Sequence, residues 1–302
     1  MRLVIALGGN ALLKRGEPLS AANQARNMAM SAKGLAAVCA GHEVALVHGN
    51  GPQVGLLALE AALYKAVPPY PFDVLGAESQ GMIGYVIAQA MRSVLPGREI
   101  SALVTQTLVD EDDAAFNHPT KPIGPVYSEA ELAAIKAPSD WHFSPDGAGT
   151  RRVVPSPTPL SIMELESIQR LVRAGVLTIC CGGGGIPVVV SGTAGAVRGV
   201  EAVIDKDLCA ALLAIALGAD HLIILTDVDG IYRDWRGPDE RLIRSIGVTE
   251  LQAMRFAGGT MGPKVEAACW FVRETGMPVS IGNLEAASAV MAGAAGTRVF
   301  GH

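Results

Sequence analysis

The chain has 302 residues and a formal net charge of −5 at pH 7, a balance that gives no indication of binding to nucleic acid or to an anionic membrane. Charged residues make up only 18% and there are 35 glycines, which is typical of a large buried sheet with many close turns. No signal peptide precedes the first strand pattern, and the longest apolar run, residues 208–219, is too short to span a bilayer, so we expect a cytoplasmic protein. The five cysteines show no CxxC spacing and the histidines no zinc-ligand spacing, so we expect buried free thiols and no zinc site.

The first predicted strand, residues 3–7, is apolar throughout, as expected of a strand that is buried on both faces. It ends in the loop Gly8-Gly9-Asn10. Glycine adopts positive φ angles and lets another molecule approach the backbone, so a loop of this kind can offer free N–H groups to an anion. A tight turn is the alternative for any single loop.

Strands and helices alternate along most of the remaining chain. We predict helices over residues 20–40, 72–94, 163–174, 205–217, 265–275 and 285–292. We predict strands over residues 43–47, 99–109, 176–181, 221–225, 242–246, 279–281 and 298–300, and a hairpin over 192–200. This alternation predicts an α/β fold whose sheet is mainly parallel and covered by helices on both faces.

Residues 116–159 interrupt the alternation. They contain eight of the 18 prolines and few long apolar runs. Long insertions of this type are often lids, so we predict an irregular subdomain that projects from the main body. A disordered loop is the alternative, but Trp141, Phe143, Val153 and Val154 indicate a segment that packs against something.

Four glycine-rich loops, at Gly8, Gly49, Gly182 and Gly259, follow predicted strands or precede a predicted helix. Ligands of open α/β sheets bind beyond the carboxyl ends of the strands, so these loops predict a ligand with several anionic groups. The absence of GxxxxGK[ST] excludes a P-loop NTPase. Residues 49–55 approach GxGxxG but are one residue too long, which leaves a dinucleotide oxidoreductase as the alternative.

Two lysines lie at the starts of predicted helices. Lys206 is flanked by Asp205 and Asp207, and Lys264 follows a glycine and a proline. Because a helix N-terminus favours negative charge, a lysine there is unfavourable unless it binds an anion. A solvated surface lysine is the alternative for each, although the two aspartates could hold Lys206 in a fixed pose.

A second pair of carboxylates, Asp227 and Asp229, follows the predicted strand 221–225. In this position the pair could meet a ribose, a metal or a lysine. A simple turn explains the same residues equally well.

Eight motifs carry a family resemblance. They are ALGGNAL at 6–12, HGNGPQVG at 48–55, QGMIGY at 80–85, PTKPIGP at 119–125, RRVV at 151–154, GGGGIP at 182–187, AVIDKD at 202–207 and MGPKVEAA at 261–268. With these motifs the sequence resembles the carbamate kinases, within the amino acid kinase family, over almost its full length. Acetylglutamate and uridylate kinases usually carry a lysine where this chain has Ala6. Two positions depart from the pattern, since Thr150 replaces the usual tryptophan and Thr260 a frequent serine.

The resemblance implies a three-layer αβα sandwich of about eight mainly parallel strands with a small projecting subdomain, and a homodimer. Residues 1–302 would form one amino acid kinase domain. Residues 1–204 would bind the small acid and include the lid at 116–159, and residues 205–302 would bind MgATP. The implied reaction is ATP + carbamate ⇌ ADP + carbamoyl phosphate, which would run toward ATP in the fermentation of arginine or similar nitrogen compounds.

The resemblance also implies roles for individual residues. Lys206, Lys264 and Lys121 would neutralise phosphate charge, Lys121 from the projecting subdomain, and Asp207 would orient a lysine. The small acid and the transferring phosphoryl group are assigned to Gly8, Gly9, Asn10, Gly49, Asn50, Gly51, Gly183 and Gly184. The nucleotide is assigned to Asp205, Asp227, Tyr232, Met261, Gly262 and Pro263. No protein ligand is assigned to Mg²⁺, because phosphate oxygens and water can supply most of its shell.

Carbamate already carries an anionic oxygen, so we expect no general base. This agrees with the absence of a Ser/His/Asp or Cys/His constellation. Two alternatives are a kinase of another small carboxylate or phosphate on the same fold, and a non-catalytic ligand-sensing module. The lysines and glycine loops argue against the sensor but not against another small acid.

Overall fold

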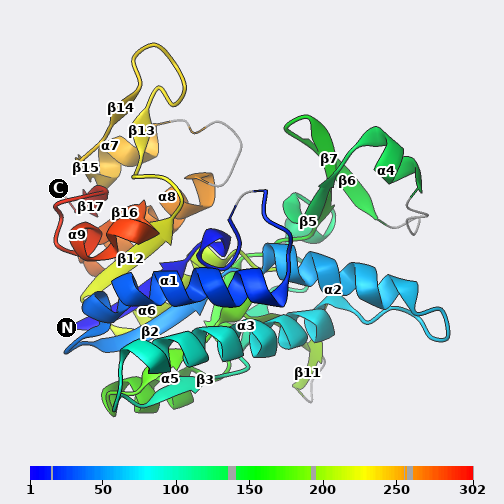
Figure 1. The fold of residues 1–302 in the computed structure, drawn as a ribbon, viewed down its shortest axis with the longest axis horizontal. Coiled ribbons are helices and arrows are strands. Elements are labelled where there is room, and N and C mark those ends of the chain that lie inside the picture. Colours follow the sequence, from blue (N-terminus) through cyan, green and yellow to red (C-terminus); the bar gives the residue numbers. More distant parts are fainter. Residues whose placement is uncertain (15, 135–140, 192–194, 255, 257–260, 302) are drawn as a thin grey trace.

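The main body is built on one mainly parallel sheet (Figure 1). The computed structural model describes residues 1–14, 16–134, 141–191, 195–254, 256 and 261–301. The eight strands lie in the order β15 (Ser245–Gly247), β17 (Thr297–Phe300), β16 (Val279–Asn283), β12 (His221–Thr226), β1 (Arg2–Leu7), β2 (Glu43–His48), β9 (Leu177–Ile179) and β3 (Ile100–Ala102). Of the paired neighbours, β16 and β17 are antiparallel and the other pairs are parallel. The prediction of a mainly parallel open sheet is therefore confirmed.

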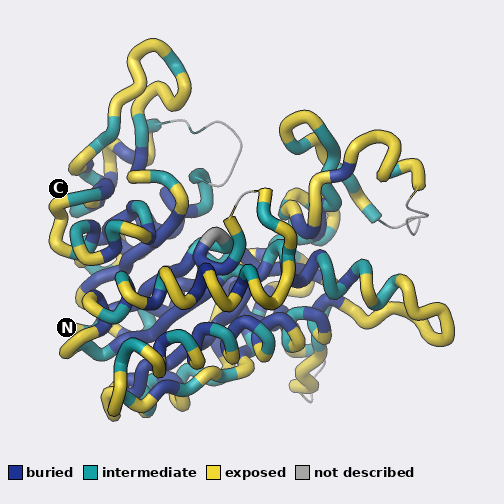
Figure 2. Tube along the Cα trace, viewed as in Figure 1, coloured by how far each residue is buried: buried dark blue, intermediate teal, exposed yellow. Residues whose placement is uncertain are grey.

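Helices cover both faces of this sheet, so its central strands are buried (Figure 2). Alternate residues of β1 face opposite sides: Val4 and Ala6 belong to one hydrophobic core, and Leu3, Ile5 and Leu7 belong to the other. The first core is completed by α5 (Leu165–Arg173), α6 (Lys206–Leu217), α7 (Val248–Ala253) and α8 (Met261–Thr275). The second is completed by α1 (Ala21–Cys39), α3 (Phe72–Val94) and α9 (Ala287–Met291).

A second sheet contains β11 (Ala196–Gly199), β10 (Ile186–Ser191), β4 (Gln106–Val109) and β8 (Pro159–Ile162). The prediction of one strand over residues 99–109 is wrong, because β3 and β4 belong to different sheets. Between them, the side chain of Gln80 accepts a hydrogen bond from the Thr105 N–H and donates one to its carbonyl, at 2.8 and 3.1 Å. The Thr105 carbonyl also accepts from the Ile186 N–H of β10 at 2.9 Å, so Thr105 is held both by Gln80 and by the second sheet. The hairpin that was predicted over residues 192–200 begins earlier, because its first strand is β10 and only its second strand, β11, lies in that range. Residues 192–194 lie outside the described residues.

The predicted strand over residues 242–246 is also divided. Its first part, β14 (Arg241–Leu242), pairs with β13 (Tyr232–Arg233) in a two-stranded hairpin. Its second part, β15, joins the edge of the main sheet beside β17. The chain therefore leaves one sheet and enters another within three residues, which a continuous apolar pattern does not reveal.

The projecting subdomain is more regular than predicted. Within residues 116–134 and 141–158, an antiparallel sheet has the order β5 (Lys121–Tyr127), β7 (Gly149–Val154) and β6 (His142–Asp146), with α4 (Glu129–Ala134) beside it. Figure 1 shows these elements standing apart from the main sheet, on the side of α2 (Gly51–Leu63). The prolines of the segment led to the expectation of irregular structure, but Pro122 and Pro125 lie within β5, which is an edge strand.

Cys39, Cys180, Cys181, Cys209 and Cys269 are free and buried, as predicted. Across the described residues, no helix combines the length and the apolar composition that a membrane span requires.

Two glycines bring the subdomain and the main body into backbone contact. A Cβ atom added to Gly55 of α2 would lie 2.0 Å from the Cα of Gly124 in β5. Gly124 itself has φ +67°, a conformation that glycine adopts without strain. The subdomain is therefore seated on α2 at a point where Gly55 has no room for a side chain and Gly124 has a backbone conformation that favours glycine.

Gly55→Ala should lower the free energy of unfolding, although alanine is normally the better helix residue by about 0.5–1 kcal/mol. The added methyl group would force α2 and β5 apart. Gly81→Ala in α3 is the matched control, because a Cβ there meets nothing within 4 Å. It should raise the free energy of unfolding by about 0.5–1 kcal/mol. Urea unfolding of both variants measures the difference. Similar gains in stability for the two would contradict the close contact.

His221, the first residue of β12, is buried, and its Nε2 lies 2.9 Å from Ser280 Oγ. Burial, assisted by Arg298, lowers the pKa of His221 to about 4. The unfolded chain keeps an ordinary histidine pKa of about 6.5, so it takes up a proton in a pH range where the folded protein does not.

The free energy of unfolding should therefore fall as pH decreases from 6.5 to 4, by up to about 3 kcal/mol from His221. His221→Gln should flatten this pH dependence in urea melts at pH 7, 6 and 5. A residual slope should remain, because burial also lowers the pKa of His48 to about 4. His118→Gln changes an exposed histidine and should leave the slope as it is. Parallel slopes for wild type and His221→Gln would overturn the interpretation.

Candidate active site

Four neighbouring parallel strands, β12, β1, β2 and β9, end at the same edge of the main sheet. The N–H of Gly8, just after β1, donates to the carbonyl of Leu225 in β12 at 2.8 Å. The N–H of Gly49, just after β2, donates to the carbonyl of Leu7 in β1 at 3.1 Å. The first two glycine loops therefore lie side by side, with η1 (Gly9–Ala11) and α2 beginning immediately beyond them.

The third glycine loop is η3 (Gly182–Gly184), which follows β9 and is buried. A Cβ on Gly182 would lie 2.4 Å from His48 Nε2, and a Cβ on Gly183 would lie 2.2 Å from Asn50 Nδ2. Asn50 also donates to Ser79 Oγ in α3 at 2.9 Å. The loop therefore packs directly against the side chains of His48 and Asn50 at the end of β2, with no room for side chains of its own at Gly182 and Gly183. Gly259 of the fourth loop lies outside the described residues.

Asp205 connects the projecting subdomain to α6. One carboxylate oxygen accepts hydrogen bonds from the N–H groups of Asp207 and Leu208, at 2.8 and 3.3 Å, and so caps the helix. The other oxygen forms an ion pair with the ammonium group of Lys121 from β5. Lys121 therefore reaches from the subdomain to the N-terminus of α6.

Asp207 lies between two lysines. Lys206 Nζ is 2.5 Å from one carboxylate oxygen and Lys264 Nζ is 3.1 Å from the other. Burial alone would raise the pKa of Asp207, but the two ammonium groups outweigh it and hold the pKa well below its ordinary value. Burial lowers the pKa of Lys206, and Asp207 opposes that shift. The carboxylate is thus ionised at neutral pH and joins α6 to α8.

Lys206 also connects this cluster to the glycine loops. A Cβ on Gly49 would lie 3.2 Å from Lys206 Cδ and 3.6 Å from the backbone nitrogen of Gly9. The lysine stem therefore lies along the edge where the loops after β1 and β2 meet. An anion at this edge would be close to the backbone N–H groups of these loops and to the ammonium group of Lys206.

The structure brings together five of the predicted residues through direct contacts: Lys121, Asp205, Lys206, Asp207 and Lys264. Gly8, Gly9, Gly49, Gly51, Asn50, Gly183 and Gly184 lie at the strand edge beside them. Asn10 lies in η1. Met261, Gly262 and Pro263 form the first turn of α8, which also carries Lys264.

Asp227 and Tyr232 lie further along the same edge, after β12. Asp227 is exposed and accepts a hydrogen bond from Thr226 Oγ1 at 3.2 Å. Tyr232 begins β13, and its hydroxyl lies 3.5 Å from Asp229 Oδ2. These contacts are within one segment, so the geometry associates the two residues with the strand edge but not directly with the lysines.

Sequence reasoning did not assign a role to Gln80 and Thr105, which fix the third glycine loop. Gln80 Nε2 donates to the Gly182 carbonyl at 3.0 Å, and Thr105 Oγ1 accepts from the Cys181 N–H at 3.0 Å. Both side chains are buried. A polar residue on an otherwise apolar helix face was the available signal, but its partner is 102 residues away in the chain.

His48, the last residue of β2, is held neutral inside the site. Burial lowers its pKa to about 4, Lys206 adds to the effect, and a hydrogen bond from Nδ1 to the Gly49 carbonyl at 3.1 Å opposes it. At neutral pH the ring is therefore uncharged and supports the loops through packing and this bond.

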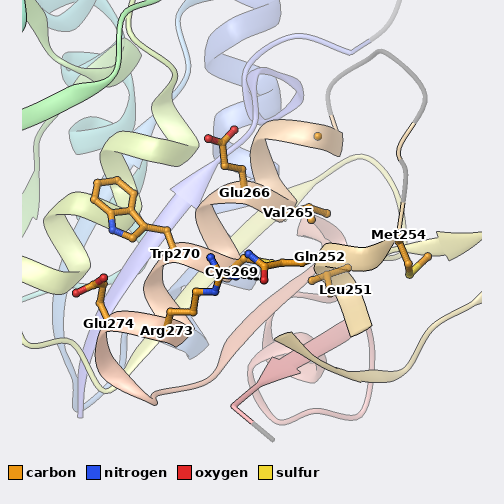
Figure 3. Close-up of a pocket in the computed structure, with 10 residues that line it drawn as sticks. Leu251, Gln252, Met254, Val265, Glu266, Cys269, Trp270, Arg273 and Glu274 are labelled. Carbon is orange, nitrogen blue, oxygen red and sulfur yellow. Dashed lines mark hydrogen bonds between the residues drawn. The ribbon is translucent and has the colours of Figure 1, made fainter. Parts of the chain in front are cut away.

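A separate cavity of about 500 Å³ lies along α7 and α8 (Figure 3). Its lining includes Glu266, Cys269, Trp270 and Arg273, which share one side of α8. Neither Lys206 nor Lys264 lines it. Gly262 and Val265 do line it, so the cavity adjoins the first turn of α8.

Comparison with known proteins places the chain in a family. The sequence model of the amino acid kinase family matches residues 1–283. A carbamate kinase of Haemophilus influenzae is 47% identical over 300 residues, covering 99% of this chain and 96% of that protein. A carbamate kinase of Escherichia coli is 49% identical over 295 residues, covering 98% of both chains. The structure of the Giardia lamblia carbamate kinase bound to AMP-PNP has a TM-score of 0.89 and 42% identity, and the match covers 100% of this chain and 98% of that one. The chain therefore belongs to the amino acid kinase family and, within it, to the carbamate kinases.

Proposed function

We propose that this chain catalyses the reaction ATP + carbamate ⇌ ADP + carbamoyl phosphate. The observation that carries the proposal is the cluster of three lysines and two aspartates beside the glycine loops. Phosphoryl transfer needs positioning and charge stabilisation far more than covalent assistance, and this cluster is suited to both. Relatives named carbamate kinase across nearly the full chain favour carbamate over another small acid, and the retained cluster argues against a sensor.

In this proposal, the loops that begin at Gly8 and Gly49 bind the small acid and the transferring phosphoryl group through N–H groups beyond these two glycines, whose own N–H groups donate to strand carbonyls. Lys206 and Lys264 compensate the charge that develops on the phosphoryl oxygens. Asp207 fixes the positions of both lysines, because its lowered pKa keeps the carboxylate ionised. No reorganisation of these charges is then needed when the reaction occurs.

The mechanism uses no general base. Carbamate is already an anion, so its oxygen needs no deprotonation before it attacks phosphorus. His48, the buried histidine of the site, has a pKa lowered to about 4 and is a weak base at neutral pH. Its role in the proposal is to support the glycine loops.

The nucleotide is proposed to lie between the end of β12 and the first turn of α8, with Asp227, Tyr232, Met261, Gly262 and Pro263 as its contacts. The AMP-PNP complex of the Giardia relative supports nucleotide binding by proteins of this kind. Nothing among the described residues groups three potential metal ligands, and Asp205 and Asp207 are engaged by lysines. We assign no protein ligand and no step to Mg²⁺, which one or two carboxylates can bind together with phosphate oxygens and water.

The projecting subdomain is proposed to act as a lid. Its ion pair from Lys121 to Asp205 would complete the charge cluster and exclude water when the subdomain is seated. A cytoplasmic homodimer that forms ATP in the breakdown of arginine or related nitrogen compounds completes the proposal.

The purified chain should form ATP from ADP and carbamoyl phosphate with Mg²⁺ present, measured in a coupled assay. Acetyl phosphate in place of carbamoyl phosphate tests the other small-acid alternative. Turnover of acetyl phosphate alone would reassign the substrate, and turnover of neither compound would contradict the proposed kinase.

Lys206→Ala and Lys264→Ala should each lower kcat by about a hundredfold or more, because each removes a preorganised charge from the transferring group. Lys33→Ala, on the exposed side of α1, is the control and should keep wild-type kcat. Circular dichroism and melting curves establish that the variants fold. Near-normal turnover in both folded site variants would remove these lysines from the mechanism.

A further inference from the structure

Arg152 of β7 connects the projecting subdomain to the main body. Its guanidinium Cζ lies 3.6 Å from the centroid of the Trp141 ring and 4.7 Å from that of Phe72. Trp141 immediately precedes β6 of the subdomain, whereas Phe72 is the first residue of α3 and is buried in the main body. One guanidinium therefore contacts an aromatic ring from each part.

The ring on the body side is itself held in place. The N–H of Phe72 donates to the carboxylate of Glu201 at 3.3 Å, which supplies the N-terminus of α3 with an acceptor. Pro71, which precedes Phe72, provides no side-chain cap. Phe72 is therefore a fixed surface for the guanidinium to contact.

A cavity of about 400 Å³ lies beside this contact, and it is lined by residues of the subdomain and of α2 and α3. Among them are Trp141, Arg152 and Phe72. The subdomain and the main body are thus incompletely packed here. The orientation of the subdomain therefore depends more strongly on the contacts that do connect it to the main body. The Arg152 contact and the Gly55–Gly124 contact are two such bridges.

The strand register transmits the position of Arg152 to the site. Arg152 of β7 lies opposite Ile123 of β5, and Val154 lies opposite Lys121, two residues along the same ladder. Because paired strands move together, a shift of Arg152 displaces Lys121 relative to Asp205.

We propose that Arg152 is a positioning residue for phosphoryl transfer, which acts by seating β5 so that Lys121 reaches Asp205. This inference rests on the proposed kinase function. An arginine suits the position because its planar guanidinium stacks on aromatic faces, whereas a lysine ammonium is a compact, strongly hydrated charge.

The test compares wild type, Arg152→Lys, Lys121→Ala and the double variant in the ATP-forming assay. Arg152→Lys should lower kcat by about ten- to a hundredfold, because a small misplacement of a charged group is costly, with little change in KM for ADP. In the Lys121→Ala background, Arg152→Lys should cause no further loss. An equal loss with and without Lys121 would overturn the proposal, as would an unchanged kcat in Arg152→Lys.

Phe72→Leu removes the ring on the body side while keeping an apolar side chain, and it should reproduce both the loss and its dependence on Lys121. Arg170→Lys on the exposed face of α5 is the control and should behave as wild type. Hydrogen exchange provides a readout independent of turnover. Peptides from β5 and the start of α3 should exchange faster in Arg152→Lys than in wild type. Faster exchange in a protein whose wild type is inactive would support the Arg152 contact and refute the proposed kinase function. Unchanged exchange would refute the contact.

Discussion

The carboxylate of Asp207 lies between the ammonium groups of Lys206 and Lys264, and all three side chains are largely buried. Removing charges from water is costly unless each finds a partner. With Asp207 absent, two buried ammonium groups would face each other without compensation. The starts of α6 and α8 can approach only because this carboxylate separates the two lysines, and the glycine loops meet the lysine stem on the other side.

Residues 205–207 connect the parts of the molecule that surround them. Asp205 caps α6 and also holds Lys121 from the projecting subdomain, so the helix start and the subdomain depend on one side chain. Lys206 runs against Gly49, which connects the segment to the loops after β1 and β2. Three consecutive residues therefore join the subdomain, the glycine loops and α8.

Local patterns predicted the parts of the fold that depend on local interactions. The apolar run of residues 3–7 predicted β1 correctly, because a strand that is buried on both faces is apolar at every position. Lys206 and Asp207 are neighbours in the chain, so the sequence alone indicated that they could pair. The break after β3 was not readable, because it depends on hydrogen bonds from Gln80, 25 residues away. The pairing of Lys121 with Asp205 spans 84 residues, and only the family resemblance indicated that Lys121 reaches the site. The spacing of residues gave no indication that the Arg152 guanidinium contacts the rings of Trp141 and Phe72.

The backbone contact between Gly55 and Gly124 has a mechanical consequence. Lys121 lies only three residues from Gly124 along β5, whereas α4 begins five residues beyond Gly124 and continues to Ala134. If the subdomain rotates about this contact, the displacement of each atom grows with its distance from the pivot. The ammonium group would then travel a shorter arc than the end of α4. Such a lever would widen the entrance for substrates and still leave the lysine close to its carboxylate.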